Sequence, residues 1–416
     1  MRRYLLVCFS WIILIFTNAF AETYHSKHFI IESPLDSRYI NFIQLNIEAY
    51  YENMAGHYFA KGWGKPLKIY YLEKQADSQE LLNKHGDKYE IGYGYYTGNS
   101  TPVIYTHRFM NDGGVTGWGA LFHEITHHFV GQNYEKIPTW FNEGLATFLG
   151  ERTKIVKGKL TVGRPNSRRE RILRNMIENG QEINIKFLTS LTTENKFHKW
   201  EPAYHVARAV FYWLYETNLL DKYLTNVQQK GYGLSVLEET AGKSYREINK
   251  ELLAFIKAKC YQAAYYEDGC LAKDIEEKKK FFEKALVIKP DYQPATLELA
   301  RCFYENKDYE KCRVFLKPIL GDLQSTEYRD AAYLTGGSYY EESLYTKALE
   351  YYEKAWEYSD YNEYKHELAY WIANCYNCLA DQENAKQWYK RFLEENWDPK
   401  HCAKWVAYAQ DYLHRK

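Results

Sequence analysis

The chain has 416 residues, of which 46% are hydrophobic and 26% are charged, and at about 150 residues per domain this length suits two or three domains. The composition supports folded cores and excludes a chain that is disordered throughout. Lys and Arg total 54, as do Asp and Glu, and this balance argues against bulk nucleic acid or an anionic membrane surface as the main partner. The sequence also lacks the glycine-rich signatures of phosphate-loop and dinucleotide-binding proteins.

An export signal is predicted at the N-terminus. Arg2 and Arg3 precede an apolar run over residues 4–16, and the small-residue cleavage pattern Ala19-Phe20-Ala21 follows. This order is typical of a secretory signal peptide, here residues 1–21. The apolar run is shorter than the roughly 20 residues that a membrane-spanning helix needs; the alternative is an uncleaved signal-anchor. We therefore expect an exported chain, periplasmic or secreted, with no membrane span after signal cleavage.

The segment after the signal has the pattern of an α+β fold. The apolar spacing of Ile40, Ile43 and Ile47 predicts a helix over residues 37–60. From about Val115 onward the pattern is mostly helical, and a small sheet followed by helices is an α+β layout. Short runs of alternating, β-branched or aromatic residues predict strands at residues 28–32, 67–72, 92–96 and 103–106.

The sharpest chemical signal is an H-E-x-x-H motif, His123-Glu124-Ile125-Thr126-His127. Two His residues four apart on a helix lie on one face, so both imidazoles can bind one metal ion. Glu124 between them is placed to take the proton of a water molecule at that metal.

Two features support a helix at this motif. Leu121, Ile125 and Phe129 form an apolar stripe with helical spacing. Helix-boundary residues flank the stripe: Gly113, Gly114 and Thr116 before it, the last as a cap, and Gly131 where the helix is expected to end.

A second helix is predicted directly afterwards, with Pro138 at its first position and Gly150 at its end. Glu143 lies in it, 16 residues after His127, so a turn back can bring its carboxylate to the same metal. Two His and one Glu leave a fourth position open, which is the pattern of a catalytic zinc site, although these ligands do not exclude other divalent metals. Thr147 is on the same helix face as Glu143 and is a candidate to hydrogen-bond a ligating His.

The sequences H-E-I-T-H-H and W-F-N-E-G-L-A together resemble the gluzincins, thermolysin-like zinc peptidases with H-E-x-x-H and a downstream Glu. More narrowly they are similar to the peptidase MA-like group, in which W-F-x-E-G-x-A recurs on the second helix. The resemblance covers roughly residues 24–256. It implies one Zn²⁺, held by His123, His127 and Glu143, with Glu124 as the general base.

The same resemblance implies how a substrate binds. It makes the strand at residues 103–106 the sheet edge along which a peptide lies, held by backbone hydrogen bonds. His128 has no role in the family's pattern, and we expect it to be structural or exposed.

Peptide hydrolysis also requires a donor for the developing oxyanion. In gluzincins a Tyr or His from a later helix supplies it, and Glu201-Pro-Ala-Tyr204-His205 opens such a helix here. Tyr204 and His205 are both candidates, and we favour Tyr204 because the family often has Tyr at the opening of this helix. The structural alternative is that Tyr204 packs in an aromatic core with Tyr212 and Trp213.

A strongly basic stretch covers residues 157–174. One interpretation is a binding site for an acidic substrate or a carboxylate terminus. The more ordinary interpretation is a solvated helix face with a loop.

From about Lys259 the chain reads as nearly continuous helix, rich in Tyr, Glu and Lys. A three-residue pattern recurs there at offsets of 34, 36 and 37 residues: Lys278/Phe282/Ala285, Cys312/Leu316/Ile319, Ala348/Tyr352/Ala355 and Ala385/Tyr389/Phe392. This resembles the tetratricopeptide repeat, whose period is about 34 residues. The resemblance implies a solenoid with a concave face for a protein partner; the alternative is a helical bundle without repeats.

All the cysteines after the signal lie in this C-terminal part: Cys260, Cys270, Cys302, Cys312, Cys375, Cys378 and Cys402. Their odd number leaves at least one free thiol unless it pairs between chains. Export permits disulfides, and placement on helices equally suits buried small hydrophobic side chains. The C-x-x-C pair at residues 375–378 lacks the second half of a four-cysteine zinc site.

Three parts are therefore predicted: a signal peptide (1–21), a zinc metallopeptidase domain (22–256) and tetratricopeptide-like repeats (257–416). The expected activity is hydrolysis of peptide bonds in a peptide or protein substrate, with a protein partner on the repeats and no nucleic acid. One alternative is an exported scaffold protein with a structural or weakened metal site, although an intact Glu124 argues against decay. Another is a zinc amidase that acts on cell-wall peptides.

Overall fold

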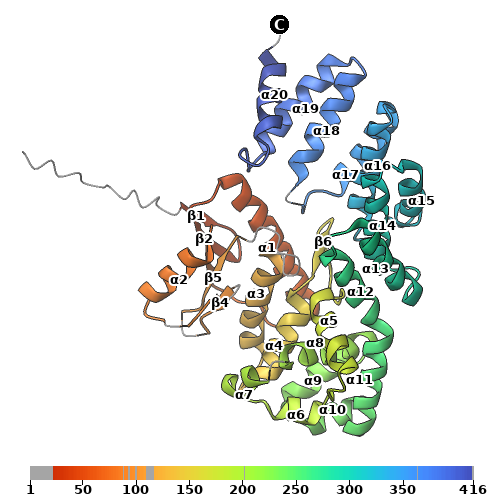
Figure 1. Ribbon diagram of the computed structural model, residues 1–416. Helices are drawn as coiled ribbons and strands as arrows, with labels where there is room; N and C mark the ends of the chain where they lie inside the picture. Colours follow the sequence, from red (N-terminus) through yellow and green to blue (C-terminus); the bar gives the residue numbers. More distant parts are fainter. Residues whose placement is uncertain are drawn as a thin grey trace, which may run out of the picture.

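The computed structural model describes residues 22–87, 89–91, 94–98, 101–108, 117–200, 202–362 and 364–414. The chain is mostly helical, with a small N-terminal sheet and a C-terminal region of helical repeats (Figure 1). The predicted signal lies outside the described residues, as do Gly113, Gly114, Thr116 and Glu201. Within the described ranges, no helix is long and apolar enough to cross a membrane.

The N-terminal sheet has five strands in the order β1-β2-β3-β5-β4. Three of them, β2, β3 and β5, are parallel neighbours, and the outer strands β1 and β4 pair antiparallel at the two edges. Their bounds are β1 (Glu22–His25), β2 (Phe29–Ser33), β3 (Leu67–Leu72), β4 (Gly94–Tyr96) and β5 (Val103–His107).

The four predicted strands are confirmed to within two residues, except that Gly92 lies outside the described residues. The first strand, β1, was not predicted because its residues are polar and mostly exposed and carry no apolar alternation. The expectation that residues 103–106 form the sheet edge is wrong. The short strand β4 returns antiparallel outside β5, so β5 is an inner strand and β4 is the edge.

Helix α1 (Ser37–His57) packs on this sheet and buries the predicted stripe of Ile40, Ile43 and Ile47. Strand register aligns Ile31 with Ile69, and Ile69 with Ile104, in the same core. Burial of such aliphatic side chains contributes roughly 1.5–3 kcal/mol each. The core therefore fixes the sheet against the helices that follow.

Ten helices and a small hairpin complete the first part of the chain as described. They are α2 (Gln75–Lys84), α3 (Gly117–Asn133), α4 (Thr139–Gly150), β6 (Lys154–Val156), β7 (Lys159–Thr161), α5 (Ser167–Glu178), α6 (Ile185–Ser190), α7 (Glu194–Lys199), α8 (Ala203–Glu216), α9 (Leu220–Lys230), α10 (Leu234–Ala241) and α11 (Tyr245–Lys259). Large aromatic side chains fill the core between α4 and α8, where Trp140, Phe141 and Phe211 contact one another.

Two predicted helix boundaries are wrong. Gly131 does not end α3, which continues to Asn133, because a glycine can remain helical when nothing requires a left-handed residue there. Pro138 has extended backbone angles and is the N-cap of α4, one position before the first helical residue, Thr139. The predicted end of α4 at Gly150 is confirmed.

The C-terminal region consists of antiparallel helix pairs that stack side by side (Figure 1). The recurring triplets fall on α13, α15, α17 and α19, and all their members except Lys278 are buried. The helices are α12 (Tyr261–Leu271), α13 (Ile275–Ile288), α14 (Gln293–Glu305), α15 (Tyr309–Leu320), α16 (Tyr328–Glu341), α17 (Tyr345–Glu357), α18 (Lys365–Cys378), α19 (Gln382–Glu395) and α20 (Ala403–His414).

The turns inside three of these pairs are built alike. Lys307, Ser343 and Ala380 each have a left-handed backbone, with φ of 61°, 60° and 61°. A non-glycine residue rarely adopts this conformation, so its return at equivalent positions marks a repeated structural unit.

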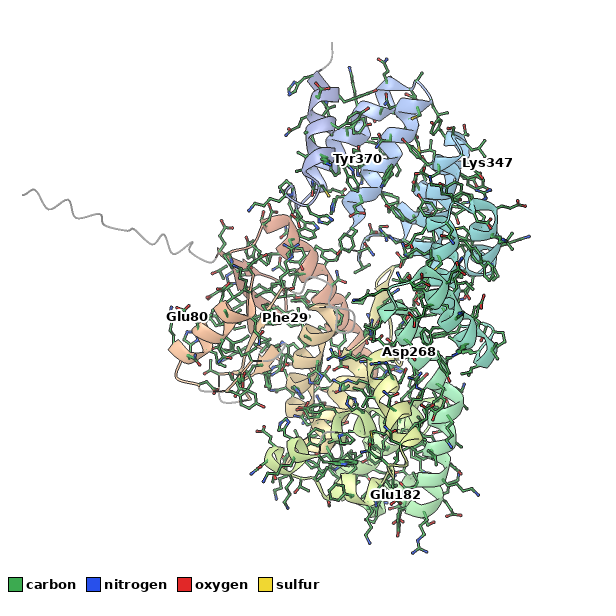
Figure 2. The ribbon with its side chains drawn as sticks, in the orientation of Figure 1. Phe29, Glu80, Glu182, Asp268, Lys347 and Tyr370 are labelled. Carbon is green, nitrogen blue, oxygen red and sulfur yellow. The ribbon has the colours of Figure 1, made fainter. Side chains whose placement is uncertain are left out.

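The solenoid contacts the first part of the chain at its beginning and middle. Asp268, labelled in Figure 2, lies on α12. It forms ion pairs of 2.7 Å with both Arg171 and Arg174 on α5. Farther along, the buried Glu327 carboxylate binds Lys154 at 3.0 Å and also pairs with Arg164.

The solenoid makes a third contact near its C-terminal end, where the turn before α20 meets the sheet. The Trp397 ring lies 4.3 Å from the ring of Tyr39, and Asp398 binds Arg108 at 3.1 Å.

The basic stretch 157–174 takes part in such contacts, while Lys157 and Arg168 stay exposed as the solvated-face interpretation expects, and the acidic-substrate interpretation stays a prediction. Arg164, Arg171 and Arg174 form ion pairs with acidic residues of the solenoid, and Arg169 pairs with the nearby Glu151.

Candidate metal centre

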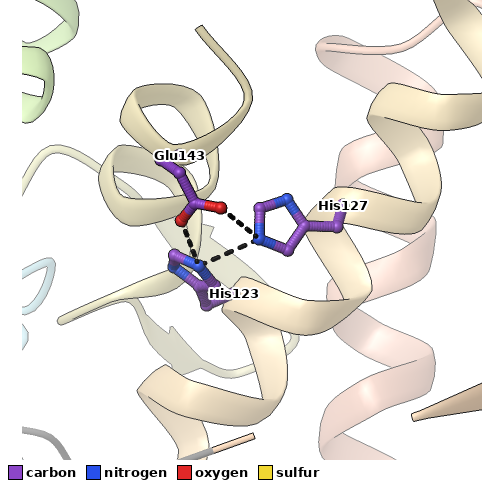
Figure 3. A group of neighbouring side chains, drawn as sticks. All are labelled: His123, His127 and Glu143. Carbon is purple, nitrogen blue, oxygen red and sulfur yellow. Dashed lines mark hydrogen bonds and ion pairs between the residues drawn. The ribbon is translucent and has the colours of Figure 1, made fainter. Parts of the chain in front are cut away.

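Three predicted ligands converge at one point (Figure 3). The Nε2 atoms of His123 and His127, both on α3, lie 3.1 Å apart. The Glu143 carboxylate, from α4, approaches them with its oxygens 3.3 Å from His123 Nε2 and 3.6 Å from His127 Nε2. All three side chains direct their ligand atoms at the same small volume.

Close crossing of α3 and α4 makes this convergence geometrically feasible. A Cβ atom at Gly150 would lie 2.4 Å from the backbone nitrogen of His123 and 2.6 Å from its Cα. Real Cβ atoms do not approach backbone so closely, and only glycine lets two backbones meet in this way. Gly150 therefore allows α4 to lie against the helix turn that carries His123.

The donor set fits a zinc ion. With Zn–N bonds of about 2.0–2.1 Å and tetrahedral angles, two ligating nitrogens are about 3.3 Å apart. The observed separation of the two Nε2 atoms is 3.1 Å. Three protein ligands leave one position for water or substrate, as in catalytic zinc sites.

Asn142 orients one of the two candidate ligand imidazoles, a role that was not assigned from the sequence. Its Oδ1 atom lies 2.9 Å from His127 Nδ1. If Nδ1 donates this hydrogen bond, the lone pair of Nε2 faces the metal position. Asn142 occupies the first of the two variable positions of W-F-x-E-G-x-A, so the motif gave no signal for this role.

The hydrogen bond expected from Thr147 to a ligating His is not found. Thr147 Oγ1 is buried and has no hydrogen-bond partner among the described residues. The second ring nitrogen of His123, Nδ1, is directed instead toward Glu151. Its distance to Glu151 Oε1 is 3.9 Å, which is too long for a hydrogen bond. Glu151 is in turn held by Arg169, through contacts of 2.5 and 2.6 Å.

Glu124 lies on α3 between the two His ligands and packs against the edge strand. A Cβ atom at Gly94 would lie 2.7 Å from Glu124 Cγ, so a glycine on β4 provides room for this side chain. Burial raises the pKa of Glu124 to about 7, with the negative charge of Glu143 acting in the same direction and the charge of His127 opposing it. A carboxylate with such a pKa can both accept and release a proton near neutral pH.

The pKa of Glu143 is shifted in the opposite direction, below its ordinary value. Its burial alone would raise the pKa, but the attraction of His127 and the hydrogen bond from His123 lower the pKa to about 2. The two buried carboxylates of the site therefore have pKa values far apart, one ionised throughout the neutral range and one poised within it.

Of the two oxyanion candidates, only Tyr204 is among the described residues that line the cavity at this site. Its ring packs against Phe197 at 4.7 Å and against the hydrophobic core that includes Tyr212 and Trp213, so the packing alternative also fits its position. Burial and the negative charge of Glu143 raise the pKa of the Tyr204 phenol, so the hydroxyl keeps its proton. Burial, together with Arg169, lowers the pKa of His205 to about 3.

The cavity has a volume of ≈ 740 Å³ and is open to solvent, with the three clustered residues in its wall. Tyr95 and Tyr96 of β4 line it on one side, and Glu194 lines it at the start of α7. The edge strand and the metal position therefore share one cavity.

His128 has no role in the H-E-x-x-H pattern. Of the two expectations, a structural or an exposed His, the structural one is confirmed. His128 is buried, and its Nδ1 atom lies 2.7 Å from the Tyr96 hydroxyl. Burial lowers the pKa of His128 to about 4, so the ring is neutral. This contact links α3 directly to β4.

Two protein families match parts of the chain. The tetratricopeptide repeat matches residues 272–332, which confirms the C-terminal repeats. A family described as a protein of unknown function, DUF1570, matches residues 120–231, the stretch that holds the metal-ligand cluster and Tyr204. No curated protein matches the chain.

Proposed function

We propose that the chain is an exported zinc-dependent peptidase with a gluzincin-type, thermolysin-like domain at residues 22–256 and a repeat region that recruits protein partners. One observation carries the proposal. His123, His127 and Glu143 have their ligand atoms within 4.8 Å of one another, beside a buried Glu124 and on the wall of a solvent-accessible cavity.

His123, His127 and Glu143 would hold the zinc ion, which would supply a Lewis acid for the scissile carbonyl and lower the pKa of the attacking water. The Glu124 carboxylate accepts a proton from the attacking water and later delivers it to the leaving amine nitrogen. The raised pKa of Glu124 suits both transfers near neutral pH. The Tyr204 hydroxyl keeps its proton and donates a hydrogen bond to the developing oxyanion.

The edge strand β4 supports a peptide as the substrate. An extended peptide can add to an exposed sheet edge through backbone hydrogen bonds, and β4 is the edge that borders the cavity. Glu124 packs against Gly94 of this strand, so a peptide bound along β4 passes next to the proposed general base.

The test is to measure zinc content and hydrolysis of a mixed peptide library with the same samples of the mature chain. We expect one zinc at this site, lost in His127→Ala together with activity. Glu124→Gln is expected to keep the zinc and lose the activity. His57→Ala, which removes an exposed imidazole from the end of α1, is the matched control and should change neither quantity. A wild-type chain that folds without zinc bound at the His123–His127 pair would contradict the proposal.

A second candidate is an interaction protein in which the metal site is structural. The tetratricopeptide match favours this candidate, since such repeats suggest protein partners. The two candidates differ at Glu124, because a structural site needs no general base. Bound zinc without cleavage of any library peptide, and with Glu124→Gln indistinguishable from the wild type, would favour the interaction protein.

A further inference from the structure

A second group of metal-ligand side chains lies near the C-terminal end of the solenoid. His366 and Glu367 belong to the first turn of α18, and Cys402 is the last residue before α20. Their ligand atoms all lie within 4.8 Å of one another. His366 and Cys402 are buried, with exposed fractions of 2% and 3%.

The separation of the two buried ligand atoms is the strongest indication of a metal site. Cys402 Sγ lies 3.7 Å from His366 Nε2. A tetrahedral zinc ion with Zn–S of about 2.3 Å and Zn–N of about 2.0–2.1 Å separates sulfur from nitrogen by about 3.6 Å. The two atoms are therefore already at nearly the distance at which one ion would hold them.

The chemistry of the three donors also suits zinc. A thiolate, an imidazole and a carboxylate are its usual protein ligands, and the thiolate disfavours magnesium and calcium. A fourth position remains for solvent or for the exposed His401, which directly precedes Cys402.

We propose that His366, Glu367 and Cys402 form a second zinc site, distinct from the one at His123, His127 and Glu143. On binding, the Cys402 S–H bond breaks, the proton passes to solvent and the sulfur forms a bond to zinc. The oxidation state of every participant is unchanged. The site does not depend on the proposed peptidase activity.

The position of this site gives it a structural role. The turn that leads into Cys402 carries Trp397 and Asp398, whose partners on the first part of the chain are Tyr39 and Arg108. His366 lies 6.0 Å from the Trp397 ring, centroid to centroid. A metal ion that joins α18 to this turn therefore holds the docking residues in place.

Cobalt(II) distinguishes the two sites, because a cysteine thiolate bound to cobalt gives an intense near-ultraviolet charge-transfer band and a His₂Glu site cannot. The full mature chain is titrated with cobalt under a thiol-free reductant. We expect the band in the wild type and in His127→Ala, and its loss in Cys402→Ser. Cys378→Ser, which removes the exposed thiol of the C-x-x-C pair, is the matched control and should keep the band.

The zinc content is measured on the same variants. We expect two zinc ions per wild-type chain and one in either His127→Ala or Cys402→Ser. His366→Gln provides a second test of the site if Cys402→Ser does not fold, and it should also lose the band. A wild type without the band, or a band that persists in folded Cys402→Ser, would overturn the proposal.

Discussion

Gly150 lies so close to His123 that a single added methyl group would collide with the ligand's backbone, at 2.4 Å from its nitrogen. A glycine in the last turn of α4 thus sets the distance between the two helices that carry the metal ligands. The contact is between backbones, so no change of rotamer can relieve a collision there. Two helices held this closely place the Glu143 carboxylate within reach of both imidazoles.

The first prediction follows from this contact. Gly150→Ala should move α4 away from α3, lower the melting temperature and weaken zinc binding by at least tenfold, as measured by competition with a chromophoric chelator. Gly131→Ala is the matched control, since nothing lies within 4 Å of the added Cβ on α3. The control should keep zinc affinity and gain roughly 0.5–1 kcal/mol of stability, because alanine replaces glycine inside a helix. Equal zinc affinity in the two variants would contradict the role of Gly150.

Asn142 provides the second prediction. Asn142→Ala removes the side chain at 2.9 Å from His127 Nδ1, and loss of such a partner typically weakens metal binding by about 10–100-fold. The same chelator competition measures the zinc affinity of this variant. Thr147→Val removes a hydroxyl that has no hydrogen-bond partner among the described residues and should leave zinc affinity unchanged. A larger loss of zinc affinity in Thr147→Val than in Asn142→Ala would instead support Thr147 as the hydrogen-bond partner of the His.

The third prediction separates binding from chemistry at Tyr204. If its hydroxyl stabilises the oxyanion, Tyr204→Phe should lower kcat by about 10²–10³-fold, with little change in KM or zinc content. Tyr212→Phe, the same substitution on the same helix but outside the cavity lining, should retain kcat. A Tyr204→Phe variant with wild-type kcat would remove this residue from the mechanism.

The fourth prediction concerns pH and the attachment of the solenoid. Burial would raise the pKa of Glu327, but Arg164 and Lys154 lower it below the ordinary value of 4.5. Arg108 and a backbone hydrogen bond likewise lower the pKa of Asp398 below 3.8, against the effect of burial. A carboxyl group with a lowered folded-state pKa stabilises the fold fully above its unfolded-state pKa, and this stabilisation is lost as pH falls through the folded-state value.

The contacts between the solenoid and the first part of the chain should therefore be intact at neutral pH and weaken below about pH 4. Hydrogen exchange of α1 and of residues 396–402, measured across this range, detects the release. Glu327→Gln should cause part of the same change at neutral pH, because it leaves two cations without their buried partner. Exchange rates that do not respond to acid would contradict this account.

The sequence was informative where a local rule determines structure. The spacing of His123 and His127 and the repeated buried triplets depend on helix periodicity, and the structure places both sets as that periodicity requires. Glu143 lies on another helix, and its approach depends on how α3 and α4 cross. Strand β4 was also predicted, but its position outside β5 was not, since sheet order depends on pairing between distant segments.

Contacts between residues far apart in the sequence account for most of the remaining differences. Arg164 and Glu327 are separated by 163 residues, and no local pattern in the basic stretch indicates that its charges are neutralised by the solenoid. The sequence predicted Thr147 as the His partner, but Asn142 on the same helix takes that position. Which of the two faces His127 depends on how α4 is rotated, and close packing of Gly150 against α3 and of Gly144 against α8 limits that rotation.

A solenoid changes its curvature by small rotations between neighbouring repeats, which add up along its length. This one is held by Asp268 near its beginning and by Trp397 and Asp398 near its end, so its two ends cannot separate while both contacts persist. A ligand that requires a flatter superhelix must first break one of them or displace the sheet. Binding of a partner to the repeats would thus be mechanically coupled to the domain that carries the candidate metal centre, and the free energy of detachment would be subtracted from the partner's affinity.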